Sequence, residues 1–156
     1  MKVSQVMNQK IIAVKRSTTL ADLIELFRSF HSFPLVPVVD ERKTLVGVVS
    51  FRGLIEAFRS SSQDILKTIP FVDEHHSDIF DMDITSEIGD LCIVDDFMQT
   101  KFVTVNQDAS IEEAYRLMQV HQTVQLPVVD SENRLVGGVG EFDIFLALFK
   151  EKGVIE

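Results

Sequence analysis

The chain has 156 residues, 46% of them apolar and 25% charged, and a formal net charge of −9. This composition is ordinary for a folded chain of one compact domain or two small ones, and the lack of a basic stripe argues against direct nucleic-acid binding. No apolar run approaches the ~18 residues that span a bilayer, and residues 1–5 lack the apolar core of a signal peptide, so we expect a cytoplasmic protein without membrane insertion. The single cysteine, Cys92, has no internal disulfide partner and is expected to be a small core residue.

The sequence contains an internal duplication. Residues 7–58, the first repeat, reappear as residues 98–149, the second repeat, with the same order of apolar and polar segments. The identity is clearest at Pro-Val-Val-Asp, which occupies residues 37–40 and 127–130. A duplication of this length predicts two copies of one structural unit.

Each repeat begins with a short apolar segment, at Ile11–Val14 and at Phe102–Val105, which we predict to be a strand. A helix follows, and in the second repeat it starts at a capping box in which Ser110 covers a free backbone N–H and Glu113 reaches back. Apolar residues then recur at the spacing of one helical face. These residues are Leu20, Leu23, Ile24 and Phe27 in the first repeat and Ile111, Ala114, Tyr115 and Met118 in the second.

Two more strands and a helix complete each repeat. The largely apolar, valine-containing segments 35–39 and 125–129 predict a strand, and a polar turn then leads into a last strand that runs directly into the final helix. A unit of about 50 residues buries little core by itself. We therefore predict an α/β (α+β) fold of two tandem β-α-β-β-α motifs, packed sheet to sheet around a pseudo-twofold axis.

An acidic connector separates the two motifs, which we place at residues 1–59 and 94–156. The connector, residues 60–93, holds much of the negative charge, because the sequence between Lys67 and Lys101 contains nine acidic residues and no Lys or Arg. Large apolar residues are spaced among these acids. Part of the connector is therefore expected to pack on the module or on a second chain.

The connector also contains polar residues that suit a cation. Oxygen ligands from Asp78, Asp81 and Asp83, next to His75 and His76, offer a site for Mg²⁺ or Ca²⁺. Their spacing lacks the glycine and the terminal glutamate of an EF-hand loop. We favour a solvated acidic linker.

A second pair of histidines lies at matching places in the repeats. His31 and His121 each precede the second predicted strand. Imidazoles at a helix end can bond the terminal carbonyls, which is the interpretation we favour over a pH-sensitive pair across the pseudo-twofold axis.

With this order of elements, the chain resembles a pair of cystathionine β-synthase (CBS) domains, an arrangement called a Bateman module. The resemblance rests on the openings Val6-Met7 and Phe97-Met98, the two Pro-Val-Val-Asp strands and the Leu-Val-Gly segments that lead to the final helices. It implies a regulatory homodimer that senses an adenosine-containing ligand, AMP, ADP, ATP or S-adenosylmethionine, between the motifs and modulates a partner protein. No sequence signature of an enzyme is found.

The ligand motif of the family is Gly, two apolar residues, Ser or Thr, two variable residues and Asp. The first repeat keeps the hydroxyl of Ser50 but has Gly53 in place of the carboxylate, and the second keeps Asp143 but has Gly140 in place of the hydroxyl. A hydroxyl beside free N–H groups suits a phosphate, and a carboxylate can accept both ribose hydroxyls. Helix capping explains Ser50 and Asp143 equally well, so both interpretations stay open.

The resemblance implies a favoured ligand site in the second repeat and a weaker one in the first. The favoured site consists of Thr104, Val105, Leu126, Pro127, Val139, Gly140, Phe142 and Asp143. The weaker site consists of Ile12, Ala13, Val14, Val36, Pro37, Ser50 and Arg52, of which Arg52 has an exposed helix position as its simpler interpretation. The alternative function is a dimerisation or protein-interaction module whose degenerate sites bind no ligand.

Overall fold

The computed structural model describes residues 1–28, 35–66 and 86–156, with the side chains of all of these except 59–66. His31, His75, His76 and the candidate cation ligands Asp78, Asp81 and Asp83 lie outside the described residues. The first repeat contains α1 (Leu20–Arg28), β1 (Val36–Val39), β2 (Leu45–Val49) and α2 (Phe51–Leu66). The second contains β3 (Val105–Asn106), α4 (Ile111–His121), β4 (Gln125–Val129), β5 (Leu135–Gly140) and α5 (Glu141–Glu151). Short helical segments lie at η1 (Val3–Gln5), α3 (Ile88–Leu91) and η3 (Val94–Asp96).

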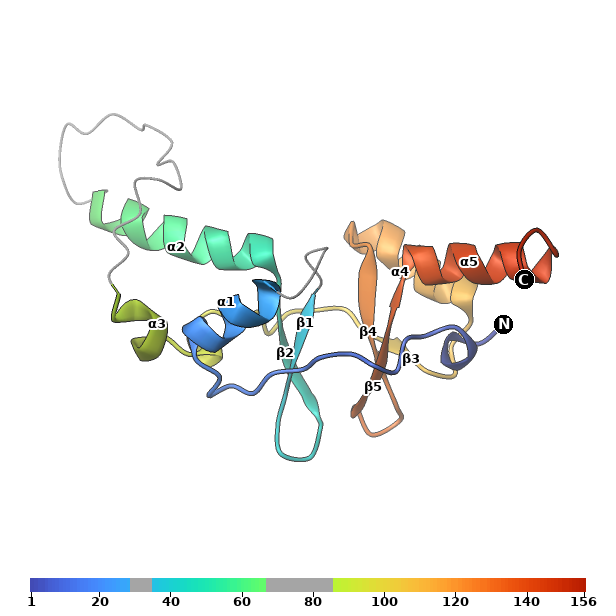
Figure 1. Cartoon of the computed structure of the whole chain (residues 1–156), viewed down its shortest axis with the longest axis horizontal. Coiled ribbons are helices and arrows are strands. Elements are labelled where there is room, and N and C mark those ends of the chain that lie inside the picture. Colours follow the sequence, from blue (N-terminus) through green and yellow to red (C-terminus); the bar gives the residue numbers. More distant parts are fainter. Residues whose placement is uncertain (29–34, 67–85) are drawn as a thin grey trace.

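The two repeats pack sheet to sheet, as predicted, with their helices on the outer sides (Figure 1). In the first sheet β1 pairs antiparallel with β2, and in the second β4 pairs parallel with β3 and antiparallel with β5. Val39 and Leu45 of the first sheet form one apolar cluster with Val129 of the second. This cluster joins the two sheets.

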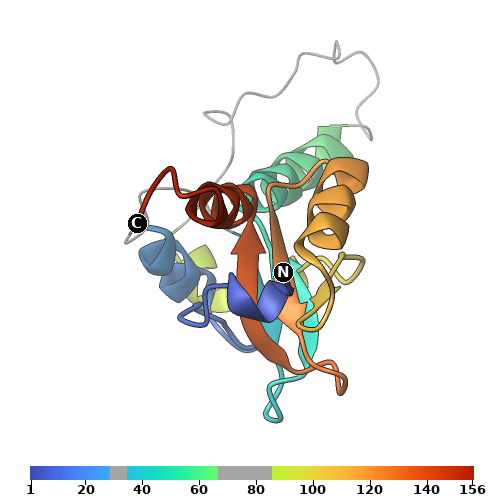
Figure 2. The same ribbon diagram turned by 90° about the vertical axis from the view of Figure 1, so that its right-hand side faces the viewer.

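The hairpin turns of the two repeats obey the pseudo-twofold symmetry. The N–H of Leu45 donates to the carbonyl of Asn133 at 3.1 Å, and the N–H of Leu135 donates to the carbonyl of Lys43 at 2.9 Å. The pseudo-twofold axis relates these two bonds to each other, because Leu45 is equivalent to Leu135 and Lys43 to Asn133. Lys43 and Asn133 also share a left-handed backbone, with φ of 65° and 60°. Figure 2 shows both hairpin turns at the end of the module opposite α2 and α5.

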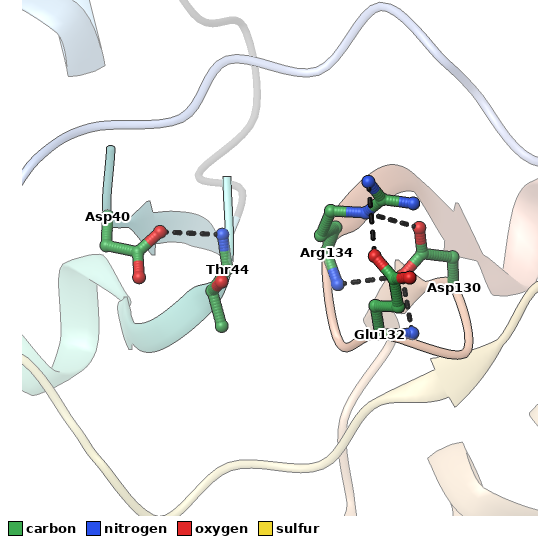
Figure 3. Close-up of polar contacts among 5 residues, drawn as sticks. All are labelled: Asp40, Thr44, Asp130, Glu132 and Arg134. Carbon is green, nitrogen blue, oxygen red and sulfur yellow. Dashed lines mark hydrogen bonds and ion pairs between the residues drawn. The ribbon is translucent and has the colours of Figure 1, made fainter. Parts of the chain in front are cut away.

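An aspartate organises each of these turns (Figure 3). The Oδ1 atom of Asp130 accepts hydrogen bonds from the N–H groups of Glu132 and Arg134, each at 2.9 Å, while its Oδ2 receives the Nε of Arg134 at 2.8 Å. Asp40 accepts from the N–H of Thr44 at 2.9 Å in the first repeat. The N–H and guanidinium of Arg134 hold the pKa of Asp130 below its usual value, against the opposing effect of burial. Burial of Asp40 would raise its pKa, but the N–H groups of Thr44 and Arg42 outweigh it and lower that pKa.

The first strand of each repeat is shorter than predicted. Within Ile11–Val14 only Val14 pairs with a strand, through bonds of 2.9 Å to the carbonyl of Pro37 and from the N–H of Val39. In the second repeat β3 begins only at Val105. Among the preceding residues, Ala13 and Phe102 are half-buried between the repeats, where they pack against the cluster that joins the sheets, whereas Ile12 is 46% exposed. The apolar character of Ala13 and Phe102 reflects burial without regular strand pairing.

The predicted faces of the first helices are correct at three of four positions. Leu20, Leu23 and Phe27 are buried, as are Ile111, Ala114 and Met118. Ile24 and Tyr115, however, are 46% and 47% exposed, so their predicted burial is wrong. These two residues are equivalents in the duplication. Tyr115 lines an apolar groove on the outer side of α4 and α5.

The core of each repeat is completed by the opening segment of the other one. We call residues 1–8 and 92–99 the opening segments. Val3, from the first of them, is fully buried among core residues of the second repeat, and Val94, from the other, is fully buried in the first repeat. The N–H of Val3 donates to the carbonyl of Ala109, and the N–H of Leu20 to that of Cys92, each at 2.9 Å. Accordingly, the N-terminus lies beside the second repeat in Figure 1.

The described ends of the predicted connector belong to the folded module. Helix α2 continues to Leu66, although we expected the first motif to end at residue 59. At the other end, Ile88 and the half-buried Cys92 pack against the core of the first repeat. The division into two motifs and a connector stays a prediction. Among the described residues, no helix has the length and apolar character needed to cross a membrane.

Candidate functional site

A cavity of about 230 Å³ lies between the two repeats. Its walls come from β4, β5 and the start of α5 in the second repeat, and from the start of β1 and residues 8–12 in the first. The lining residues are Asn8, Lys10, Ile11, Ile12, Leu35, Val36, Pro37, Gln125, Leu126, Pro127, Gly137, Gly138, Val139, Gly140 and Asp143. We call this cavity the second cleft, because its carboxylate comes from the second repeat.

The floor of the second cleft depends on two adjacent glycines. A Cβ atom at Gly137 would stand 2.8 Å from the sulfur of Met7 and 2.9 Å from the carbonyl oxygen of Asn8. A Cβ atom at Gly138 would stand 3.3 Å from Cγ2 of Ile11. The missing side chain of Gly137 lets the first opening segment lie this close to β5, and the missing side chain of Gly138 leaves space beside Ile11.

Asp143 is held at the start of α5 by a helix cap. The N–H of Gly140 donates to its Oδ2 atom at 2.7 Å. In the first repeat Ser50 caps α2 by accepting from the N–H of Gly53 at 3.0 Å. The capping interpretation is therefore confirmed for both residues. The cap on Asp143 uses one of two carboxylate oxygens, so capping and ligand binding are compatible there.

Three further polar residues, Asn8, Lys10 and Gln125, line the second cleft among its apolar residues. Oε1 of Gln125 accepts from the N–H of Leu35 at 3.3 Å and so joins the two repeats at the cavity wall. Lys10 and Asp143 are the charged lining residues. Oδ1 of Asn8 accepts from the N–H of Lys10 at 2.9 Å, which turns the asparagine toward its own backbone. Apolar walls with a few fixed polar groups are typical of small-molecule sites.

The cavity takes residues from both predicted sites. It contains Leu126, Pro127, Val139, Gly140 and Asp143 of the favoured set together with Ile12, Val36 and Pro37 of the weaker set. The two sets mix because residues 8–12 follow the opening segment that crosses to the second repeat. Sequence reasoning therefore missed Asn8, Lys10 and Ile11. The pair Gly137-Gly138 was the sequence signal for a close approach of another segment at this place.

The remaining predicted residues lie elsewhere, and their participation in binding stays a prediction. Val14 and Val105 are buried in the cores of the first and second repeat, and Ala13 packs between the sheets. Thr104 is half-buried just before β3, Arg52 is exposed, and Phe142 is 71% exposed on α5.

Two further expectations concern histidines and metal ligands. His121 is the last residue of α4, at the helix end where we expected it, and Gln122 follows in a left-handed conformation with φ of 51°. Among the residues whose side chains the structure describes, 1–28, 35–58 and 86–156, no three His, Cys, Asp or Glu side chains gather closely enough to hold a metal ion.

Comparison with known proteins agrees with the duplicated architecture. The model of the CBS domain matches residues 3–60 and again residues 94–150. CBSX2, a chloroplastic CBS domain-containing protein of Arabidopsis thaliana, is 32% identical over 133 residues, which are 83% of this chain and 55% of that protein. The crystal structure of CBSX2 in complex with AMP superposes with a TM-score of 0.70 at 27% identity, covering 97% of this chain and 98% of that one.

A second solved structure extends the comparison to a membrane channel. The cytosolic domain of the Mg²⁺ channel MgtE, in complex with ATP, is 28% identical with a TM-score of 0.61. The match covers 90% of this chain and 46% of that one. With the family model matched in both repeats, the chain belongs to the CBS domain family, as a tandem pair of these domains.

Proposed function

We propose that this chain is a regulatory, ligand-sensing CBS pair that binds an adenosine-containing ligand in the second cleft and modulates a partner protein. The candidate ligands are AMP, ADP, ATP and S-adenosylmethionine. The observation that carries the proposal is the position of Asp143, a carboxylate fixed at the start of α5 beside an apolar cavity with a glycine floor.

The lining of the cleft suits the parts of a nucleoside. Apolar side chains of β1 and β4, among them Val36 and Leu126, can cover the faces of a flat base. The second carboxylate oxygen of Asp143 can accept from the ribose hydroxyls. The start of α5 and the ammonium group of Lys10 offer positive charge to a phosphate.

Two of the compared structures support this choice of ligand class. CBSX2 has been crystallised in complex with AMP and the cytosolic domain of MgtE in complex with ATP. Both are more than 25% identical to this chain over nine-tenths of its length or more. AMP is therefore the first ligand to test.

The test is calorimetric titration of the whole chain with AMP, ATP and S-adenosylmethionine. We expect binding by the wild type and a loss of at least about tenfold in affinity for Asp143→Ala. Because this variant also loses a helix cap, Ser50→Ala serves as the matched control: it removes the cap of α2 and should bind like the wild type. Equal affinity of Asp143→Ala and the wild type, or no heat with any ligand, would contradict the proposal.

We also propose that the protein acts as a homodimer through the outer face of α4 and α5. This face presents an apolar groove whose walls include Tyr115, Phe142, Phe145 and Leu148, all more than 40% exposed. The rings of Phe145 and Phe149, both partly exposed on α5, stack with their centroids 4.3 Å apart. Exposed apolar patches of this kind mark interaction sites.

The same groove favours the second candidate function, a dimerisation module without a ligand. In that case the carboxylate of Asp143 would serve only as a helix cap. The two functions differ in their thermal response: a ligand receptor gains stability with AMP, whereas a pure dimer gains it only with protein concentration.

A further inference from the structure

The first repeat has a place equivalent to the second cleft, and the backbone of the two places is alike. In the second cleft Asn8 pairs with Gly138 through N–H···O bonds of 2.8 and 3.0 Å. In the first repeat Gln99, the equivalent of Asn8, pairs with Val48 in the same way, at 2.9 and 3.0 Å. Any difference between the two places therefore comes from side chains.

The first difference is Val48, which stands where the second cleft has Gly138. A side chain at Gly138 would point toward Ile11, because the Cβ position is 3.3 Å from Cγ2 of that residue. Val48 carries such a side chain and is only 2% exposed. The valine thus fills the floor that the glycine leaves open.

The second difference is Gln99. A Cβ atom at Gly53, the equivalent of Asp143, would stand 2.8 Å from Nε2 and 3.6 Å from Cδ of Gln99. The amide of Gln99 therefore occupies the space of the missing acidic side chain, although the residue as a whole is exposed. In the second cleft, the side chain of Asn8 is one methylene shorter than that of Gln99, and its Oδ1 atom accepts from the N–H of Lys10 instead.

We propose that the first repeat's cleft is closed by its own side chains, with Gln99 as its cover and Val48 as its floor, so that each chain holds one ligand, in the second cleft. The identity of that ligand rests on the proposed function. The closure does not, because it follows from contacts within the free protein.

A ligand-free measurement tests the cover. A Gly→Ala substitution inside a helix normally stabilises the protein. In α4 the residue three positions after the capping Ser110 is Glu113, so a serine cap leaves room for a side chain at that position. We expect Gly53→Ala to lower the melting temperature, or leave it unchanged, in the wild type and to raise it in a Gln99→Ala background. The matched control is an Asn8→Ala background, in which Gly53→Ala should behave as in the wild type. An equal rise in all three backgrounds would overturn the proposal.

The number of ligands per chain is the second test, measured by native mass spectrometry with AMP. One AMP per chain, lost in Asp143→Ala, is the expected result. Two AMP per chain would overturn the closure while leaving the proposed function intact. Absence of any complex would defeat the proposed function, and the melting temperatures of the Gly53→Ala series would still decide whether Gln99 covers the first cleft.

Discussion

Asn8 and Gly138, near opposite ends of the chain, are joined by a reciprocal pair of backbone hydrogen bonds of 2.8 and 3.0 Å. This pairing fixes the first opening segment along β5 and places Lys10 and Ile11 beside the cavity that also contains Asp143. A ligand in the second cleft would therefore contact both repeats at once. Binding should consequently stabilise the whole module as one unit.

The two side chains that close the first cleft should weaken AMP binding when they are introduced into the second cleft. The variant Asn8→Gln/Gly138→Val introduces the side chains of Gln99 and Val48 at their equivalent positions. We expect the affinity for AMP to fall at least about tenfold, because the floor and the rim of the cavity are then filled. Calorimetry measures the affinity, and circular dichroism checks that the fold persists. Unchanged affinity in a folded variant would show that Gly138 does not shape the binding site.

The exchanged opening segments should contribute equally to stability. Val3→Ala and Val94→Ala each remove two methyl groups from a fully buried position. Each should lower the free energy of unfolding by about 2 kcal/mol and the melting temperature by roughly 5 °C. Val154→Ala, at an exposed position, is the control and should have little effect. Two separate transitions in either core variant would contradict the interlocked arrangement.

Acid should weaken the fold through the aspartates of the hairpin turns. The pKa of Asp130 is lowered below its ordinary value of 3.8 by the N–H and guanidinium of Arg134, so its contribution is complete above that pH and is lost as the pH falls below it. We expect the melting temperature to decline from about pH 4 downward. Asp130→Asn, which cannot ionise, should show a shallower decline over the same range. Parallel curves for the two proteins would argue against this role of Asp130.

A charge on the outer face of α5 should dissociate the proposed dimer. Phe142 is 71% exposed in the single chain and lines the apolar groove. Phe142→Glu would place a carboxylate in a desolvated interface, which is costly without a partner. Sedimentation velocity should show a dimer for the wild type and a monomer for the variant at the same micromolar concentration. Glu151→Gln, at the end of the same helix, is the control. A dimeric Phe142→Glu variant would place the interface elsewhere.

The duplication was sufficient to predict the architecture. Residues 125–129 form β4 as predicted, and Ser110 accepts from the N–H of Glu113 at 3.1 Å, as its capping box requires. Such features depend on neighbours along the chain, which a sequence displays directly. The caps at Ser50 and Asp143 belong to the same class, since each contact spans three residues.

Features that depend on residues far apart along the chain could not be predicted from the sequence. The apolar character of Ile11–Val14 indicated burial correctly for Val14, but it did not show that Ala13 would pack between the sheets and that Ile11 and Ile12 would line a cavity. For the same reason, Ile24 and Tyr115 have the spacing of a buried helical face yet are 46% and 47% exposed. Apolar periodicity identifies a helical face, but it does not show which side chains of that face another element will cover.

The exchange of opening segments has a consequence for synthesis of the chain on the ribosome. Residues 1–66 contain α1, β1, β2 and α2, but their core lacks Val94 until the chain has been extended by almost thirty residues. Val3, in turn, is synthesised long before Val105 and Ile111, which belong to the same core cluster. The first repeat therefore leaves the ribosome with part of its apolar core exposed, and Val94 covers this surface only later. Neither core is complete until the chain has reached the second motif, and folding should be slow relative to that of helical bundles with local contacts.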